Sequence, residues 1–144
     1  MAGTWTQGQP SHTFVVALLS VADNVGTGLF DGSSSASRLL YISGHGSTNA
    51  SAGSARGISS PGDAWARIEV GWNGASSRMR VNDLAAIGPV NLGAGAPGGI
   101  TLGCKGDISD HADGYIAEIL DYGRILSVAE QTQVHAYLAT RYGI

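Results

Sequence analysis

Two carboxylates near the C-terminus are the first residues to consider for catalysis. Glu118 and Asp121 lie on a predicted strand over residues 115–122. Retaining glycoside hydrolases place two carboxyl groups about 5 to 5.5 Å apart, flanking the bond that is cleaved. A spacing of three residues puts Glu118 and Asp121 on opposite faces of an extended strand. The two carboxylates cannot flank one glycosidic bond, so the sequence predicts no catalytic residue of this kind.

Three aspartates that precede this strand are candidate metal ligands. Asp107, Asp110 and Asp113 lie around His111 in a short polar loop. Ca²⁺ binds about six to eight oxygen atoms, but this loop lacks the fixed ligand spacing of an EF-hand. A solvated acidic turn is the favoured interpretation. The sequence therefore predicts no cofactor, and a Ca²⁺ site at these three aspartates stays the alternative.

The histidines and the cysteine show no spacing typical of a metal or nucleophile site. His12, His45 and His135 are far apart in the sequence, unlike the ligands of structural zinc sites. Cys104 is the one cysteine, so it cannot form an intrachain disulfide, and a buried thiol is expected. No serine lies in a nucleophile-elbow sequence. We therefore expect a protein that is not an enzyme.

Aromatic and amide side chains leave carbohydrate binding open. Lectin sites use exposed aromatic rings together with amide or carboxylate groups on loops, because a ring offers an apolar face beside hydrogen-bonding partners. Trp5, Trp65, Asn49 and Asn73 could supply such groups. Trp72, in contrast, is assigned to the core.

The C-terminal segment predicts the elements that surround these residues. Residues 115–122 are apolar on both faces, which indicates a strand covered on both sides. The expected faces are Ile116, Leu120 and Tyr122 on one side, and Tyr115, Ala117 and Ile119 on the other.

A capped helix is predicted after this strand. Ser127 and Glu130 have the spacing of a capping box, and Gly143 is placed for a left-handed C-terminal cap. We therefore expect a helix over residues 128–142. Apolar side chains at helical spacing predict its docking face, namely Val134, Tyr137, Leu138 and Tyr142.

A set of positions in this segment forms a long motif with fixed spacing: Gly114, Ile116, Ala117, Glu118, Tyr122, Arg124, Leu126, Ser127, Glu130, Tyr137, Leu138, Tyr142 and Gly143. The motif resembles the end of bacterial and phage laminin-G-like domains, which belong to the concanavalin A-like lectin and glucanase superfamily. The resemblance implies an all-β fold, a two-sheet antiparallel jelly-roll sandwich with one C-terminal α-helix. It also implies a structural role for Glu118, which would accept hydrogen bonds from a loop or from an arginine such as Arg124.

The strongest earlier strands are residues 12–19 and 64–72. The first is apolar enough to be buried on both faces, which predicts a central position in a sheet. The second alternates, so one face is expected in the core while Arg67 and Glu69 face water. Asn73 and Gly74 predict a tight turn into a second strand at 78–82.

Weaker strands are expected at residues 25–30, 38–43 and 100–104, the last with Ile100, Leu102 and Cys104 on one face. Residues 44–62 and 89–99 are rich in glycine and are interpreted as surface loops, the first with room for one weak strand. Many short strands joined by turns are typical of a two-sheet sandwich.

Composition and length indicate one domain. Residues 12–144 form the expected sandwich, and residues 1–11 form an extended N-terminal arm in which Trp5 and Pro10 are the candidate interaction residues. The net charge of −3 and the single lysine argue against nucleic acid as a partner. The sequence contains neither a signal-peptide pattern nor an apolar run long enough to cross a membrane.

These features favour a structural or interaction protein. The expected role is that of a phage virion surface protein, either a capsid decoration or a tail-associated part. Such a protein would be made in the host cytoplasm, form homo-oligomers and contact other virion proteins such as the major capsid protein. The alternative is a lectin or adhesion module that binds a cell-surface glycan, and a glycoside hydrolase is a distant third.

The carboxylate spacing generates a prediction about activity. Purified protein should release no reducing sugar from glucans, because Glu118 and Asp121 do not share a strand face. A reducing-sugar assay with a known glucanase as positive control tests this. Turnover that disappears in Glu118→Gln would contradict it.

Overall fold

The computed structural model describes residues 8–20, 27–33, 39–42 and 46–144. These residues form ten strands, one 3-10 helix, η1 (Gly74–Ser76), and one α-helix, α1 (Val128–Tyr142). The strands are β1 (Ser11–Leu19), β2 (Thr27–Asp31), β3 (Leu39–Ile42), β4 (Ser47–Ser51), β5 (Arg56–Ser59), β6 (Trp65–Trp72), β7 (Ser77–Val81), β8 (Ile87–Val90), β9 (Thr101–Leu102) and β10 (Gly114–Tyr122).

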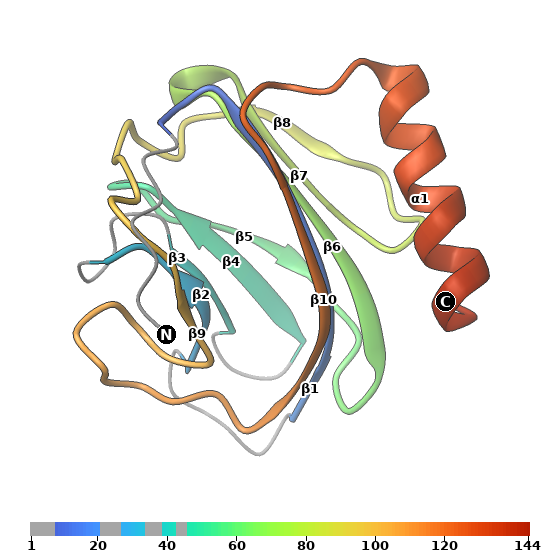
Figure 1. The fold of residues 1–144 in the computed structure, drawn as a ribbon, viewed down its shortest axis with the longest axis horizontal. Helices are drawn as coiled ribbons and strands as arrows, with labels where there is room; N and C mark the ends of the chain where they lie inside the picture. The colour runs from blue at the N-terminus through green and yellow to red at the C-terminus, as the bar shows by residue number, and fades with distance from the viewer. Residues whose placement is uncertain (1–7, 21–26, 34–38, 43–45) are drawn as a thin grey trace.

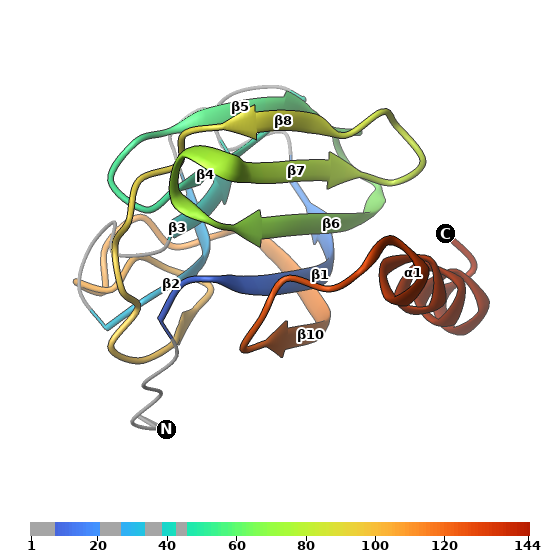
Figure 2. The same cartoon turned by 90° about the horizontal axis from the view of Figure 1, so that it is seen from above.

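The strands make two sheets, and α1 adds a third layer. Sheet A has the order β10-β1-β6-β7-β8, and sheet B has the order β5-β4-β3-β2-β9. The paired strands of both sheets run antiparallel. Sheet A lies between sheet B and the helix (Figure 1), and the view from above separates the helix from the two sheets (Figure 2). The predicted two-sheet antiparallel sandwich with one C-terminal helix is confirmed.

The main core lies between the sheets. β1 is central in sheet A, as its apolar sequence predicts, and its inward residues Val15 and Ala17 are buried. Trp72 of β6 is fully buried, and its indole N–H donates to the Thr13 hydroxyl at 2.9 Å. Sheet B contributes Leu29, Phe30, Leu40, Ile42 and Ala50 to the same core.

A second, smaller core lies under α1 on the outer face of sheet A. Phe14 and Val16 point to this side because β1 alternates its side chains between faces. Leu126 and Leu138 cover them, and Leu138 is only 1% exposed. Both faces of β1 are therefore buried, one by sheet B and the other by the helix.

Both ends of α1 are capped. The Ser127 hydroxyl accepts from the Glu130 amide, while the Glu130 carboxylate accepts from the Ser127 amide, which is a capping box. Gly143 adopts a left-handed conformation with φ 69° and donates its N–H to the Ala139 carbonyl. Within the described chain, no helix has the length and apolarity required to cross a membrane.

The docking face of α1 differs from the prediction at one residue. Tyr137 is 42% exposed and donates its hydroxyl to Glu118 instead of packing in the core. His135 takes its place on the buried side, where its ring meets Phe14 edge-on. Val134 and Tyr142 pack against the second core as expected.

The glycine-rich loops contain more strands than predicted. Residues 44–62 include β4 and β5, which pair as a hairpin, and β8 continues into the region interpreted as a loop from residue 89. Small and polar residues hide these strands, because their β-structure depends on pairing with neighbours rather than on their own preference.

Two strands also depart from the expected alternation. A bulge between Ile116 and Glu118 shifts the register of β10, so Ile116 and Ile119 both pack against the main core. β9 covers only Thr101 and Leu102, and Leu102 is 53% exposed although Cys104 is buried. Gly103 has φ 73° and interrupts the predicted strand between them.

The buried helix contact generates a stability prediction. Leu138→Ala should lower the free energy of unfolding by about 2 to 5 kcal/mol, because it opens a cavity in the second core. Val128→Ala is the matched control, since Val128 is 76% exposed on the same helix and should change stability by less than about 0.5 kcal/mol. Urea denaturation measures both. Equal midpoints would mean that α1 is not docked.

Candidate functional site

The outer face of sheet A carries a buried charged cluster that the sequence did not predict. Arg67 and Glu69 were expected to face water, but they are only 4% and 6% exposed. The reason is that α1 packs over this face of β6. The alternation of side chains along a strand shows which residues share a face. It does not show whether another element, here α1, covers that face.

Glu69 is held by side chains from two other elements. Its Oε1 is 2.8 Å from His12 Nε2 of β1, and its Oε2 is 2.7 Å from His135 Nε2 of α1. The Arg80 Nε of β7 is 3.7 Å from Oε2. We call His12, Glu69 and His135 the polar clamp, because these three residues join the helix to the sheet.

Hydrogen bonding defines the protonation of His12. The Leu126 amide donates to His12 Nδ1 at 3.2 Å, so this nitrogen carries no proton. The proton is therefore on Nε2, which donates to Glu69. Both ring nitrogens of His12 are engaged, and neither can take a proton from a substrate without breaking one of these bonds.

The clamp keeps Glu69 ionised. Burial is the largest single influence and raises the pKa of this carboxyl, but the interactions with His12 and His135 together outweigh it and lower the pKa from 4.5 to about 2. A carboxylate of such low basicity is a poor general base near neutral pH. The cluster is therefore suited to holding α1 in place rather than to catalysis.

Arg67 reinforces the same attachment. Its guanidinium donates to the His135 carbonyl at 3.2 Å and to the Asp83 carboxylate at 2.8 Å. Asp83 is largely exposed, whereas the arginine lies under the helix. The helix is thus bound to β6 by Glu69 and by Arg67.

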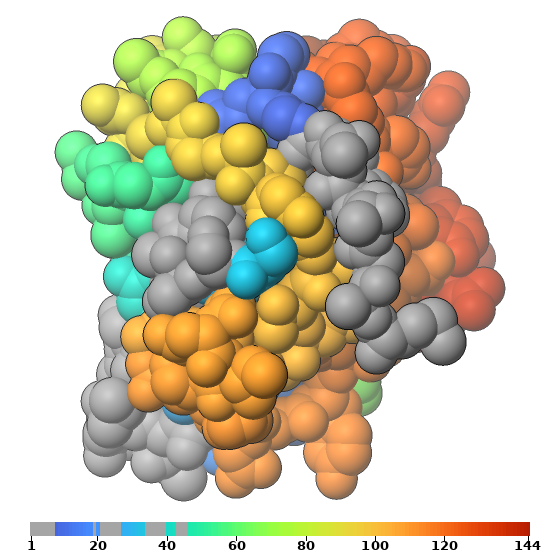
Figure 3. Space-filling model, turned by 60° about the vertical axis from the view of Figure 1, so that its left-hand side comes forward, coloured from blue at the N-terminus to red at the C-terminus, as the bar shows by residue number. Residues whose placement is uncertain are grey.

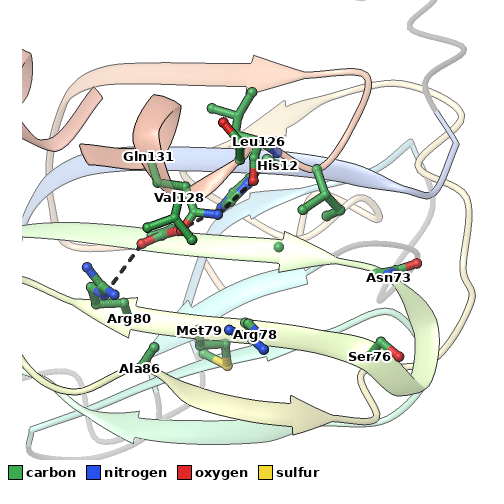
Figure 4. A pocket seen from close by; sticks show the side chains of 14 residues that line it. His12, Asn73, Ser76, Arg78, Met79, Arg80, Ala86, Leu126, Val128 and Gln131 are labelled. Carbon is green, nitrogen blue, oxygen red and sulfur yellow. Dashed lines mark hydrogen bonds and ion pairs between the residues drawn. The ribbon is translucent and has the colours of Figure 1, made fainter. Parts of the chain in front are cut away.

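A groove of about 400 Å³ opens beside the clamp. Its floor is the outer face of β6 and β7, and its wall is the segment that leads into α1 (Figure 4). Figure 4 shows Asn73 and Ser76 at one end and Arg80 at the other, with Arg78 between them. The polar side chains that line the groove include Asn73, Ser76, Arg78, Arg80 and Gln131.

The two carboxylates considered for glycoside hydrolysis lie on opposite faces of β10, as their spacing predicts. Glu118 points to the helix and accepts hydrogen bonds from Tyr137 at 3.0 Å and Tyr142 at 2.9 Å. Asp121 points inward and accepts from Thr13 at 2.6 Å. The arginine near Glu118 is Arg141, at 3.6 Å.

The suggested partnership of Glu118 with Arg124 is wrong. Arg124 instead makes a two-point contact with Glu130, with distances of 2.9 and 2.5 Å. This pair lies at the exposed start of α1, away from the carboxylate on the strand. The side chains that approach Glu118 come from the last turns of the helix.

The three aspartates considered for Ca²⁺ make separate contacts. Asp110 pairs with Lys105, and Asp107 accepts from the Ser109 amide. The Asp113 carbonyl accepts from Ser20. The part of the chain that the structure describes contains no group of three or more His, Cys, Asp or Glu side chains that could hold a metal. Figure 3 shows these loops, in orange, beside the yellow loop that precedes β9.

The described end of the predicted N-terminal arm contacts the sandwich. Ser11 belongs to β1, where it is buried opposite Trp72. Gln9 accepts from the Gly74 amide at 2.7 Å and donates to the Gly93 carbonyl at 3.1 Å. Pro10 is exposed beside this anchor. Trp5 lies outside the described residues.

The candidate carbohydrate-binding residues do not form one site. Asn73 lines the groove, but Asn49 is buried on β4 with its amide 3.3 Å from the Ser47 hydroxyl. Trp65 is 38% exposed at the start of β6. Trp65 and Tyr115 both lie opposite Leu18 on β1, so they form a partly exposed row across sheet A.

Comparison with known proteins places the fold. The chain matches no protein-family model, and no curated protein is similar to it in sequence. Among solved structures it is similar to the receptor-binding domain of a mosaic C/D botulinum neurotoxin, with a TM-score of 0.64 and 11% identity over 88% of this chain and 36% of that one. It is also similar to a SAP-like pentraxin from Limulus polyphemus, with a TM-score of 0.61 and 12% identity over 94% of this chain and 72% of the pentraxin.

The chain shares with these structures a two-sheet antiparallel jelly-roll sandwich. The chain spans about a third of the neurotoxin domain, and the identities show a common fold rather than a common ligand. The neurotoxin structure is described as a receptor-binding domain.

Sequence reasoning missed the clamp for a physical reason. Glu69 is 57 positions from His12 and 66 positions from His135. No spacing rule links residues so far apart, so the sequence gives no reason to pair a helical histidine with a strand glutamate. One signal was present. His135 lies three and seven residues before Leu138 and Tyr142, on the side of the helix that was predicted to dock.

The clamp generates a prediction about pH. Because the folded pKa of Glu69 is below the unfolded value, its stabilising contribution is complete above pH 4.5 and is lost as the pH falls toward 2. The difference corresponds to about 3 kcal/mol. Glu69→Gln should therefore be less stable at pH 7 and should lose this part of the acid dependence.

Urea denaturation at pH 7, 4 and 3 measures both effects. Asp107→Asn is the control, because it removes an exposed carboxylate on a loop outside the clamp and should change stability by less than about 1 kcal/mol. If Glu69→Gln unfolds at the wild-type urea concentration at pH 7, the clamp does not hold the helix.

Proposed function

We propose that this protein is a non-catalytic binding module that holds its ligand in the groove beside α1. One observation carries the proposal. The side chains of Asn73, Ser76 and Arg78 line the groove and have no hydrogen-bond or ion-pair partner among the described residues. In the polar clamp next to them, both oxygens of Glu69 and both ring nitrogens of His12 are engaged in holding the helix.

This division separates a rigid support from groups that remain available for a ligand. Ligand sites commonly combine a preformed hollow with a few polar groups that set orientation. The clamp fixes the helix that forms one wall, so the groove does not require reorganisation before binding. Catalysis by a hydroxyl such as that of Ser76 would require a general base, and His12 and Glu69, the acid–base groups that line the groove, are both engaged.

We further propose that the module works on the surface of a phage particle, as a capsid decoration or tail-associated protein. The resemblance of the C-terminal motif to bacterial and phage laminin-G-like domains supports this setting. Low surface charge also supports it, since 13% charged residues provide little repulsion between neighbouring subunits. The partners would be other virion proteins such as the major capsid protein, and further copies of this chain.

A lectin or adhesion role is the second candidate. It is supported by similarity to the neurotoxin domain, which is described as receptor-binding. In this case the groove would take a cell-surface glycan directly. The two candidates share the groove, but the virion role also uses the N-terminal arm as a contact region.

Two binding measurements test the proposal. The virion role predicts that the full chain co-sediments with particles of the source phage, and that removal of residues 1–7 abolishes co-sedimentation without changing the melting temperature. Residues from position 8 are retained because Gln9 anchors the start of β1. A glycan array in parallel tests the lectin role.

The outcomes separate the candidates. Binding to particles but not to the array supports the virion role, whereas binding to one glycan without co-sedimentation supports the lectin role. A chain that binds neither contradicts the binding function. Chemical turnover of a bound glycan would overturn the non-catalytic proposal.

A further inference from the structure

The groove contains two arginines on one face of β7. Arg78 and Arg80 are two positions apart, so both point outward from sheet A and their Cα atoms are about 6.5 Å apart. Like charges at this spacing repel each other. Their arrangement becomes favourable when an anionic group lies between or beside them.

Most other basic side chains in the described structure have a carboxylate of their own. The pairs are Arg67 with Asp83, Lys105 with Asp110, Arg124 with Glu130 and Arg141 with Glu118. Arg78 has no carboxylate partner among the described residues. The groove therefore carries positive charge that the protein does not neutralise.

Arg80 is only partly compensated. Its Nε is 3.7 Å from Glu69, beyond hydrogen-bond distance, and this buried nitrogen has no hydrogen-bond partner in the described structure. Glu69 already accepts hydrogen bonds from His12 and His135. The Glu69 carboxylate is therefore shared by His12, His135 and Arg80. The N–H groups of the Arg80 guanidinium remain available to donate hydrogen bonds to a ligand.

The two strand neighbours of Arg78 are glycines, which have no side chains to cover its guanidinium. Gly71 lies opposite it on β6, and Gly88 of β8 approaches its Cγ so closely that an added Cβ would be 2.7 Å away. Neither neighbour has a side chain that could cover the guanidinium. A Cβ on Gly71 would lie 3.6 Å from Ile125, so a side chain there would project into the groove.

Neutral polar groups surround the charged centre. Asn73 and Ser76 lie at one end of the groove (Figure 4), and Gln131 stands on the helix side. The Gln131 amide donates to the Leu126 carbonyl at 2.8 Å, which leaves its Oε1 as an acceptor. Ile125 and Val128 add apolar surface to the wall. This mixture suits a ring that carries hydroxyls, C–H groups and one anionic substituent.

We infer that the groove binds an acidic saccharide, with Arg78 and Arg80 receiving its carboxylate or sulfate group. Arginine suits this role because its planar guanidinium donates two parallel hydrogen bonds to such an anion. The inference rests on the proposed binding function and specifies its ligand class. Two arginines and a net charge of −3 do not provide the extended positive surface that a nucleic-acid backbone requires.

Titration calorimetry with matched saccharides tests the ligand class. Oligogalacturonate is compared with its methyl ester, which has the same rings without the charge. Sulfated dextran is compared with plain dextran, and polyglutamate and inorganic sulfate are added as anions without sugar rings. We expect an acidic saccharide to bind at least ten times more tightly than its neutral counterpart and to weaken as salt is raised.

Three variants test the site. Arg78→Gln should weaken binding of the acidic saccharide at least tenfold, and Gly71→Val should abolish it by filling the groove. Arg56→Gln is the matched control, because Arg56 is exposed on β5 in the other sheet and no carboxylate pairs with it in the described structure. This control should bind like the wild type. Thermal melting verifies folding, and Arg78→Gln tests the site even if Gly71→Val does not fold.

The outcomes distinguish this inference from the proposed function. Equal binding of charged and neutral saccharides, with loss in Gly71→Val, overturns the acidic specificity but retains the binding function. Tighter binding of polyglutamate than of any saccharide overturns the saccharide assignment. Equal weakening in Arg56→Gln and Arg78→Gln means non-specific attraction and overturns the site. Absence of binding to every probe overturns the inference, and particle and array binding then decide the proposed function separately.

Discussion

The structure depends on one buried carboxylate. Glu69 lies between sheet A and α1, where an unpaired charge would be strongly destabilising. His12 and His135 satisfy its two oxygens, and the Leu126 amide in turn fixes the proton of His12. The strand, the helix and the segment between them are therefore positioned together. Removal of either histidine would leave the Glu69 carboxylate buried with an unsatisfied oxygen. The helix is therefore stable only in the position that brings His135 to Glu69.

The groove is a consequence of this position. The helix covers the outer face of β1 and part of β6, where Phe14, Val16 and Leu138 form the second core. It does not cover β7, so Arg78 and Arg80 stay accessible at the edge of the helix. Gly71 has no side chain to fill the groove between the part of sheet A under the helix and the exposed part on β7. The same interaction that stabilises the helix thus produces an open polar surface, and this is the physical basis for proposing a binding function.

Lectin-like sandwiches serve many purposes, and the fold therefore does not identify a ligand. Here the local chemistry is informative. The acid–base groups near the groove are engaged internally, while donors on its floor are not. Glu118 similarly contacts two tyrosine hydroxyls of α1, and Asp121 contacts Thr13 inside the sandwich. The carboxylates of this region support the architecture, and arginine and neutral polar side chains are left for contact with a partner.

The sequence by itself determined features that depend on near neighbours. The cap formed by Ser127 and Glu130, the central apolar strand β1 and the opposite faces of Glu118 and Asp121 follow from spacing along a single element. The tertiary structure decided what depends on pairing and coverage. β4 and β5 form because neighbouring strands supply their hydrogen bonds, and a bulge in β10 brings Ile116 inward. The clamp joins residues 12, 69 and 135, and no periodic pattern links positions so far apart. Burial of Glu69 was decided only when the helix packed on its strand, because a polar residue on an alternating strand is compatible with water or with a buried partner.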